Sequence, residues 1–319
     1  MSATPTTSAF ATSLFERWAV YFAEMYPPVQ RLVMAGVLFI GPYFALTLLS
    51  PDHPTQPVFN QPAVAGWLTY FFFLLLLRVS DEFKDFELDC RLFPERPLPS
   101  GRVLPGDLRI LGALCVAVLV LLNTLVAPLT VGFVTILGYA ALMLKFFFIK
   151  ERIQKSLLLA LVTHNPVIFL MTLYTSSLVS AQFGSSALSW TFLKVGVLFA
   201  LPGLIWELSR KIKAPQDENE YETYSKVFGY KLAALLPVGL YAAHFALTLE
   251  LAKDLALSMP YLVALGLGAL LASGASLRFL ARPNAMTSRL RPPAEIYATL
   301  ASLGFIVDLS WARGIAWHL

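Results

Sequence analysis

The residues best suited to chemistry lie in the stretch SDEFKDFELDC, which runs from Ser80 to Cys90. Asp81, Asp85 and Asp89 recur every fourth residue, so a helix would carry all three carboxylates on one face. Like charges at this spacing destabilise a helix unless a cation neutralises them. Mg²⁺ prefers oxygen ligands and commonly takes one or two carboxylates together with substrate phosphates. The spacing therefore indicates a site for a divalent metal and a phosphorylated substrate, with a solvated, salt-bridged loop as the alternative.

A second charged stretch reads WELSRKIKAPQDENEYETYSKVFG and begins at Trp206. Glu207, Arg210 and Lys211 stand at i, i+3 and i+4, which places them on one face of a helix. A carboxylate flanked by a guanidinium and an ammonium group suits a metal or phosphate contact. Further acids follow, and for three of them a solvated loop is a real alternative: Glu218, Glu220 and Glu222.

The composition is that of a membrane protein. The 319 residues are 57% hydrophobic and 14% charged, with a mean hydropathy of +0.66, whereas soluble domains are nearer half apolar and a quarter charged. The net charge of +4 is weak evidence for nucleic acid, so we expect no nucleic-acid partner and take the lipid bilayer as the surroundings. Cys90 and Cys115 form neither a disulfide framework nor a metal site.

Nine apolar runs are long enough to cross a bilayer, so the sequence predicts an all-α, polytopic membrane protein. The expected spans form one bundle around a central cavity and lie at about 31–50, 62–79, 107–127, 129–149, 156–180, 188–208, 230–251, 257–279 and 293–315. The chain then divides into an N-terminal segment, residues 1–30, and a nine-helix domain, residues 31–319.

The N-terminal segment carries apolar residues at helical spacing from Phe10 to Met25, and Pro27 and Pro28 end this pattern. The pattern indicates an amphipathic helix that lies on the membrane surface, with an ordinary linker helix as the alternative. No basic region precedes a short apolar core, so we expect no cleavable signal peptide.

Basic residues cluster in alternate linkers, at 78–109, 145–155, 210–231 and 278–291. Lysine and arginine gather in cytoplasmic loops, so these linkers and the N-terminus are predicted to be cytoplasmic. Both acidic stretches lie on that side as well. Three of the 24 basic residues fall outside the pattern: Lys194, Lys253 and Arg313.

The stretch DEFKDFELD, followed by RPLPSGR from Arg96 to Arg102, resembles the first motif of the UbiA superfamily of intramembrane prenyltransferases. That motif reads Asn-Asp-x-x-Asp-x-x-x-Asp and is followed by Arg-Pro-Leu/Ile-x-x-Gly. Asp85 and Asp89 match its later aspartates. Glu82 stands at its first aspartate and Asp81 at its asparagine, while Arg96, Pro97, Leu98 and Gly101 match the trailing block.

The resemblance implies two groups of metal ligands and a set of substrate contacts. The expected Mg²⁺ ligands are Asp81, Glu82, Asp85 and Asp89 in the first group and Glu207 and Asp217 in the second. Diphosphate contacts are expected from Arg96, Arg102, Arg210 and Lys211, and from Lys145, which follows a stretch similar to the end of the family's fourth helix. Lys145 could equally be a snorkelling lysine at the membrane surface.

Polar and aromatic residues inside the spans supply further candidates. His164 and Asn165 lie inside the fifth span, where polar groups are costly. They could orient an acceptor or take a proton, or could bond to a neighbouring helix beside Pro166. Tyr174 and the phenylalanines at 71–73 and 146–148 could line a prenyl tunnel or shield a carbocation, although lipid-facing side chains would look the same.

The family resemblance implies a Mg²⁺-dependent prenyltransferase that ionises an isoprenyl diphosphate and transfers the prenyl group to an acceptor, most often an aromatic ring. The expected location is a bacterial inner membrane, with the active site on the cytoplasmic side. One alternative is a terpene cyclase of the same superfamily, in which the chain's own double bond captures the cation. A transporter is a further alternative, although transporter sites usually lie at mid-membrane and these acids do not.

Overall fold

Long apolar helices dominate the computed structural model, which describes residues 13–52, 54–126, 130–220 and 222–318. Residues 1–12, including Phe10 of the expected amphipathic helix, lie outside the described residues. Seven helices are long and apolar enough to cross a membrane. They are α2 (Pro28–Leu48), α3 (Gln61–Lys84), α5 (Pro105–Leu121) continued by the π-helical turn η1 (Leu122–Val126), α8 (Leu157–His164) with α9 (Pro166–Phe183), α10 (Trp190–Arg210), α12 (Tyr230–Leu255) and α13 (Met259–Ala281).

Two further segments that the sequence predicts as spans are less regular. Helix α6 (Val131–Leu144) is apolar but has only 14 residues. Helices α14 (Arg291–Thr299) and α15 (Phe305–Arg313) are joined by the π-helical turn η4 (Leu300–Gly304) and carry Glu295 and Asp308. The all-α polytopic architecture is therefore confirmed, and seven of the nine expected spans meet the requirements of length and hydropathy within the described ranges.

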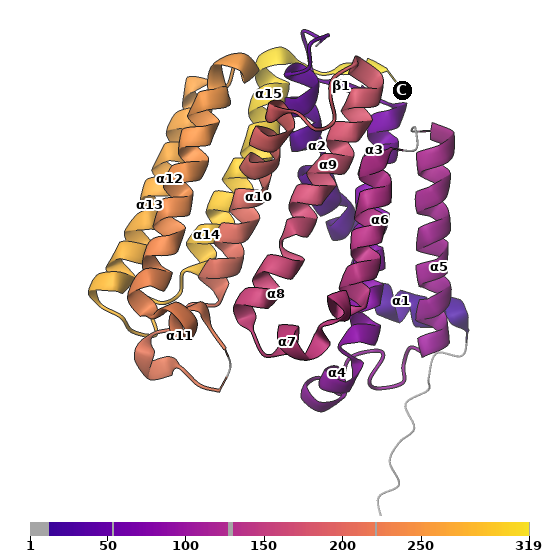
Figure 1. The fold of residues 1–319 in the computed structure, drawn as a ribbon, viewed down its shortest axis with the longest axis vertical. Helices are drawn as coiled ribbons and strands as arrows, with labels where there is room; N and C mark the ends of the chain where they lie inside the picture. Colours follow the sequence, from indigo (N-terminus) through magenta and orange to yellow (C-terminus); the bar gives the residue numbers. More distant parts are fainter. Residues whose placement is uncertain (1–12, 53, 127–129, 221, 319) are drawn as a thin grey trace, which may run out of the picture.

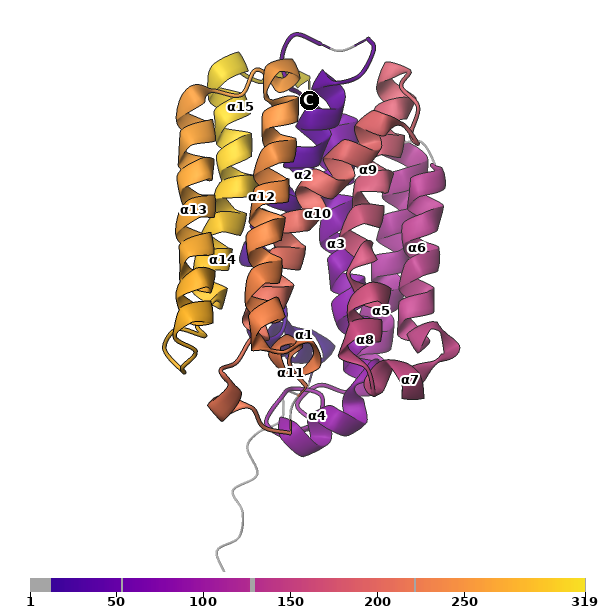
Figure 2. The same cartoon turned by 60° about the vertical axis from the view of Figure 1, so that its left-hand side comes forward.

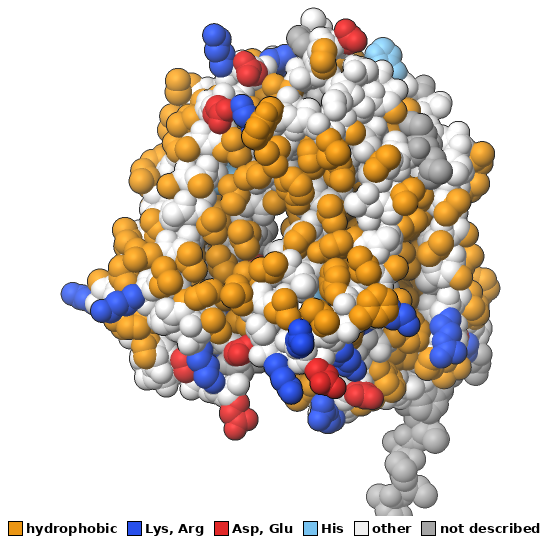
Figure 3. Space-filling view, viewed as in Figure 1, with side chains coloured by type: hydrophobic (Ala, Val, Ile, Leu, Met, Phe, Trp, Pro, Cys, Tyr) orange, Lys and Arg blue, Asp and Glu red, His pale blue; other side chains and the backbone are white. Residues whose placement is uncertain are grey.

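The bundle has two chemically different ends (Figures 1 and 2). We call the end that carries the short helices α4 (Phe86–Leu92), α7 (Lys150–Gln154) and α11 (Tyr224–Phe228) the charged end. The four basic linkers all lie there, and Figure 3 shows Lys, Arg, Asp and Glu side chains gathered at that end below a broad hydrophobic band. The linkers rich in lysine and arginine therefore lie at one end of the bundle, and the linkers poor in them lie at the other.

A short pair of strands marks the opposite end, which we call the strand end. Strand β1 (Val58–Asn60) pairs in parallel with β2 (Ala316–His318), and Val58 lies opposite Ala316. This pair was not predictable from the sequence, because each strand is only three residues long. The pairing attaches the end of the chain to the connection between α2 and α3.

The N-terminal segment forms a helix, as the sequence predicts. One side of this helix packs against the bundle, and it also carries exposed apolar residues. Helix α1 (Leu14–Glu24) begins at Ser13, whose hydroxyl accepts from the Glu16 backbone N–H while the Glu16 carboxylate accepts from that of Ser13. Tyr21 is fully buried in a cluster with residues of α3 and α5, whereas Phe15 is 77% exposed.

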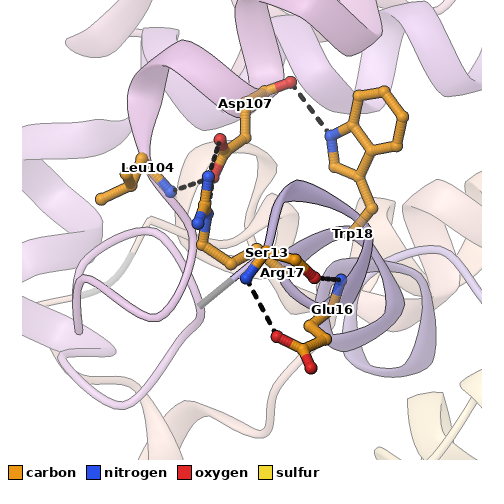
Figure 4. Close-up of polar contacts among 6 residues, drawn as sticks. All are labelled: Ser13, Glu16, Arg17, Trp18, Leu104 and Asp107. Carbon is orange, nitrogen blue, oxygen red and sulfur yellow. Dashed lines mark hydrogen bonds and ion pairs between the residues drawn. The ribbon is translucent and has the colours of Figure 1, made fainter. Parts of the chain in front are cut away.

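Arg17 fastens α1 to the start of α5 (Figure 4). Its guanidinium donates to both carboxylate oxygens of Asp107, at 2.6 and 2.8 Å, and the Trp18 indole donates to the Asp107 backbone carbonyl at 3.1 Å. The same carboxylate accepts from the backbone N–H of Leu104 at 2.8 Å. The Asp107 carboxylate therefore accepts three hydrogen bonds, although its side chain is only 6% exposed.

This contact predicts a difference between two matched variants. Arg17→Gln should lower the melting temperature of the detergent-purified protein by several degrees, because it leaves the buried Asp107 carboxylate without its cation. Arg291→Gln breaks an exposed pair with Glu295 and should change the melting temperature little. Thermal unfolding followed by tryptophan fluorescence measures both, and equal shifts would contradict a structural role for the Arg17 contact.

Candidate functional site

The two acidic stretches meet at one cavity of about 580 Å³ at the charged end. Asp85 comes from the end of α3 and Glu207 from the end of α10, and both line this cavity. Basic and polar side chains share the wall with apolar ones, and the lining consists of Lys84, Asp85, Leu88, Phe146, Ile153, Ala160, Leu161, His164, Asn165, Val167, Ile168, Glu207, Arg210, Lys211 and Tyr224. Residues far apart in the sequence thus form a single mixed polar and apolar site.

The first acidic stretch is a bent helix. The backbone N–H of Asp85 donates to the carbonyl of Asp81, and that of Asp89 donates to the carbonyl of Asp85, both at 2.9 Å. Asp85 has φ −103° and ψ 7°, which ends α3 and starts α4. The three aspartates therefore do not share one straight helix face as the spacing predicted, and the bend moves like charges apart.

Two of the first-motif acids are held by arginines. Glu82 accepts from Arg78 at 2.6 Å, and Asp89 accepts from Arg96 at 2.8 Å. Both carboxylates are buried, and neither residue lines the cavity. Arg96 also stacks on the ring of Phe93, 4.0 Å from its centroid. These pairs fix the bent helix and the following loop in place.

Asp85 differs from those acids because it makes no ion pair within 4.0 Å among the described residues. Burial raises the pKa of its carboxyl, and the charge of Lys84 opposes that rise. Asp81 has only a long contact to the same lysine, at 3.8 Å. Asp85 is therefore the acid of the first stretch that lines the cavity without an ion pair, and Asp81, outside the lining, is only loosely paired.

Lys84 is a site residue that sequence reasoning missed. Its side chain is 8% exposed, and its Nζ lies 2.9 Å from His164 Nε2 and 4.6 Å from the centre of the Phe146 ring. His164 Nδ1 lies 3.1 Å from the Ala160 carbonyl, so we assign the proton to Nδ1 and the lone pair to Nε2. The only signal in the sequence was the position of Lys84 directly before Asp85.

A break in the fifth span lets His164 and Asn165 line the cavity. Helix α8 ends at His164 and α9 begins at Pro166, because proline has no N–H to continue the helix. The Thr163 carbonyl accepts from the hydroxyl of Tyr139 at 2.7 Å. Broken helices of this kind are tolerated in membranes where they border a cavity.

The turn that carries Phe146 is strained. Phe146, Phe147 and Phe148 have φ of 48°, 50° and 61°, in the left-handed region that costs about 1–2 kcal/mol per non-glycine residue. The Phe147 ring contacts both Tyr139 and His164, whereas Phe148 is 78% exposed. Strain of this kind is often found at functional sites.

The second stretch presents one acid between two cations. Glu207 accepts from Arg210 Nε at 2.6 Å and from Lys211 Nζ at 3.1 Å, and its side chain is 14% exposed. Arg210 also lies over the ring of Trp206, and Lys211 lies near that of Tyr224. The sequence-based prediction that Glu207, Arg210 and Lys211 lie together agrees with this geometry.

The acids that follow Glu207 have different surroundings. Asp217 lies in the short 3₁₀ helix η3 (Pro215–Asp217), is exposed and does not line the cavity. Glu218 accepts from the hydroxyls of Thr223 and Ser225, at 2.6 to 2.8 Å. Glu222 accepts from the backbone N–H of Leu157 at 2.9 Å. Glu218 and Glu222 thus have structural contacts of their own.

Four expected substrate contacts do not line the cavity. Arg96 pairs with Asp89 instead. Arg102 donates to both oxygens of Glu24 and to the Glu95 carbonyl, and its hydrogen bonds lower the pKa of the Glu24 carboxyl. Lys145 is exposed at the end of α6. Tyr174 is fully buried in the core, where its ring packs near those of Tyr70 and Phe133. Their roles in substrate binding stay predictions.

No protein-family model matches the chain, and no curated protein matches it. Solved structures do match its fold. A structure from a study of digeranylgeranylglyceryl phosphate synthase in membranes aligns with a TM-score of 0.64 and 16% identity, over 92% of this chain and 99% of that one. The apo structure of a UbiA homologue from Aeropyrum pernix K1 aligns with a TM-score of 0.58 and 14% identity, over 86% of this chain and 97% of that one. The chain therefore has the UbiA fold, which confirms at the level of fold the resemblance noted in the sequence.

The contrast between Asp85 and Asp89 predicts opposite effects on stability. Asp85→Asn removes a charge that burial disfavours, so we expect the melting temperature at about pH 7 to stay the same or rise. Asp89→Asn weakens the buried pair with Arg96 and should lower it. Thermal unfolding in detergent measures both variants against the unchanged protein.

The pH dependence gives a second check on Asp85. Because its pKa is raised on folding, protonation of Asp85 contributes stability below the ordinary aspartate pKa of about 4, and that contribution is lost as pH rises through the raised value. The advantage of Asp85→Asn should therefore grow as pH rises from about 4. An advantage that shrinks with rising pH would contradict the assignment.

Proposed function

We propose that this chain is a Mg²⁺-dependent intramembrane prenyltransferase of the UbiA superfamily. In this proposal it ionises an isoprenyl diphosphate and transfers the prenyl group to an aromatic acceptor. The observation that carries the proposal is the meeting of Asp85 and Glu207, from the two distant acidic stretches, at one cavity that also holds Lys84, Arg210 and Lys211. The UbiA fold of the whole bundle supports the same reaction class.

The donor set fits magnesium together with a phosphorylated substrate. No group of three or more His, Cys, Asp or Glu side chains is clustered closely enough to hold a metal alone, within the residues that the structure describes. Mg²⁺ commonly binds through one or two carboxylates and completes its shell with substrate phosphates and water. Asp85 and Glu207, which line the cavity from α3 and α10, would each supply such a carboxylate, and Asp81, one helical turn before Asp85, is a further candidate outside the lining. Bound there, Mg²⁺ would supply positive charge to the leaving diphosphate.

The cations of the cavity would hold the diphosphate. Lys84, from α3, and Arg210 and Lys211, from the end of α10, line the same cavity and present ammonium and guanidinium donors to phosphate oxygens. In the reaction the C1–O bond breaks and the electron pair leaves with the diphosphate. Arg210 and Lys211 would stabilise the negative charge that develops on its oxygens, whereas Lys84 would mainly bind the ground-state diphosphate.

The acceptor would bind beside the broken span. Phe146 and Tyr224 offer flat faces on the cavity wall, and Asn165 offers an amide for a polar substituent. The acceptor forms a bond to C1 of the prenyl cation and loses a proton. We assign His164 Nε2 as the group that accepts this proton, because its lone pair faces the cavity lysine and becomes available when diphosphate binds Lys84.

The membrane arrangement completes the proposal. Helix α6 and the broken α14–α15 segment would cross the bilayer beside the seven regular spans, which gives nine crossings. The charged end would face the cytoplasm because it carries the basic linkers. Helix α1 would lie at the surface of the same leaflet, with its apolar face in the headgroup region. The expected cell membrane is the inner membrane of a bacterium.

Loss of either cavity carboxylate, Asp85 or Glu207, should strongly slow catalysis without loss of fold. Asp85→Asn and Glu207→Gln should each lower kcat about 10²-fold or more, because a charge contact made in the transition state is lost. Glu220→Gln, an exposed acid outside the cavity lining, serves as the matched control and should keep full activity. The assay follows diphosphate release from isoprenyl diphosphates of several lengths, with Mg²⁺ and a panel of aromatic acceptors.

The same assay separates the proposal from its alternatives. Mass spectrometry should find a prenylated acceptor, and no product without an acceptor. A cyclic hydrocarbon or alcohol from the diphosphate alone would mean terpene cyclisation. Full diphosphate release by both acid variants, with Mg²⁺ present, would overturn the catalytic assignment.

Lys84 should act mainly in binding. We expect Lys84→Met to raise KM for the isoprenyl diphosphate about tenfold, because it removes a charge-assisted hydrogen bond to a phosphate oxygen. Lys155→Met changes an exposed lysine outside the cavity lining and should leave KM unchanged. Steady-state kinetics with the acceptor at saturation measures both, and an unchanged KM for Lys84→Met would rule out the diphosphate contact.

A further inference from the structure

A second cavity, of about 410 Å³, lies at the strand end of the bundle, opposite the candidate active site. It is formed where the end of α2, the start of α10 and the ends of α12 and α15 meet. Its lining combines leucines with charged residues and consists of Leu48, Leu49, Trp190, Thr191, Lys194, Leu251, Asp254 and Arg313. Figure 3 shows a small group of charged side chains at this end of an otherwise apolar surface.

The guanidinium of Arg313 is poorly satisfied. Its two terminal nitrogens make only long hydrogen bonds, at 3.4 Å to the Thr55 carbonyl and 3.3 Å to the Asp254 carbonyl. Its Nε is shielded from solvent and has no partner. No carboxylate lies within 4.0 Å of its nitrogens in the described ranges. A guanidinium has five N–H donors, so most of its capacity is unused.

Asp254 lines the same cavity, and its carboxylate forms no ion pair with any described residue. Arg313 contacts the backbone carbonyl of Asp254 but does not pair with its side chain. Two opposite charges therefore border one cavity without neutralising each other. This arrangement suits a ligand that carries both a negative and a positive group.

The cavity lies at the height along the bundle where the lipid headgroups would be. Trp190, Trp311 and Trp317 are 77%, 91% and 62% exposed at this end. Exposed tryptophans are typical of the headgroup region, where the ring is apolar and the indole N–H meets water. Leu48, Leu49 and Leu251 give the cavity an apolar wall, which suits the glycerol and upper acyl part of a lipid.

We propose that this cavity binds the headgroup of an aminophospholipid such as phosphatidylethanolamine. The lipid phosphate contacts Arg313 and Lys194, and the primary ammonium contacts the Asp254 carboxylate. Lys194 pairs with Glu250 at 2.5 Å, so its contact with the phosphate is shared with that acid. The site also accounts for two of the three basic residues that lie outside the cytoplasmic clusters of the sequence, because a ligand at the opposite end requires them there. It does not depend on the reaction proposed for the charged end.

Lipid retention tests the site on the full-length protein. The protein is reconstituted in nanodiscs of phosphatidylethanolamine, phosphatidylglycerol or phosphatidylcholine, transferred to detergent, and analysed by native mass spectrometry. The unchanged protein should keep phosphatidylethanolamine at least tenfold more than either other lipid. Phosphatidylglycerol has no ammonium for Asp254, and the quaternary ammonium of phosphatidylcholine has no N–H to donate.

Three variants identify the contacts. Arg313→Gln should reduce retained phosphatidylethanolamine about tenfold, the size expected when a charge-assisted hydrogen bond is lost. Asp254→Asn should remove the preference for phosphatidylethanolamine over phosphatidylglycerol. Lys253→Gln is the matched control, because Lys253 is an exposed basic residue of the same helix end that does not line the cavity.

Melting temperatures measured without added lipid establish that each variant is folded. Equal retention of phosphatidylethanolamine by Arg313→Gln and Lys253→Gln would overturn the phosphate contact. Equal retention of all three lipids by the unchanged protein would overturn the proposal as a whole, because binding would then need only an acyl chain.

Discussion

A buried carboxylate at the end of an apolar bundle is costly unless a cation lies close enough to neutralise it, and this constraint organises the charged end. Arg78 holds Glu82, Arg96 holds Asp89, and Arg17 holds Asp107. Each of these pairs braces an element of the charged end: the end of α3, the loop after α4, and the contact between α1 and α5. Asp85, on the cavity wall, is the exception, because it has no such partner among the described residues.

The sequence located the elements better than the contacts between them. Apolar runs placed α2, α10 and α13 within a few residues of their ends, because the hydrophobic length of a span is a local property of the chain. The same runs did not reveal that α6 is short or that η4 interrupts α14–α15. Those features depend on how neighbouring helices pack, which composition does not record.

Within the candidate site, the sequence predicted which types of residue would be present. It did not predict which of them line the cavity and which form structural ion pairs. Asp85 and Glu207 were both expected to bind metal, and they share one cavity. Asp89 was expected to act in the same way, yet it pairs with Arg96 outside the lining. Spacing along a helix cannot distinguish these cases, because a partner seven residues further along the chain decides between them. Lys84 escaped notice because its importance comes from His164, which is 80 residues away.

Pairing offers a physical criterion for separating structural charges from functional ones in this bundle. A carboxylate that is buried outside the cavity beside one close arginine, as Glu82 and Asp89 are, contributes to the architecture, and removing either partner leaves an uncompensated charge. A half-buried charge without a partner lowers stability in the empty protein, so its presence is explained best by a ligand that completes it. Asp85 at one end and Arg313 at the other are both of this second kind, and each lies on the wall of a cavity. In the proposed arrangement the two cavities lie at opposite membrane surfaces, so a substrate at one leaflet and a structural lipid at the other would bind without competition between them.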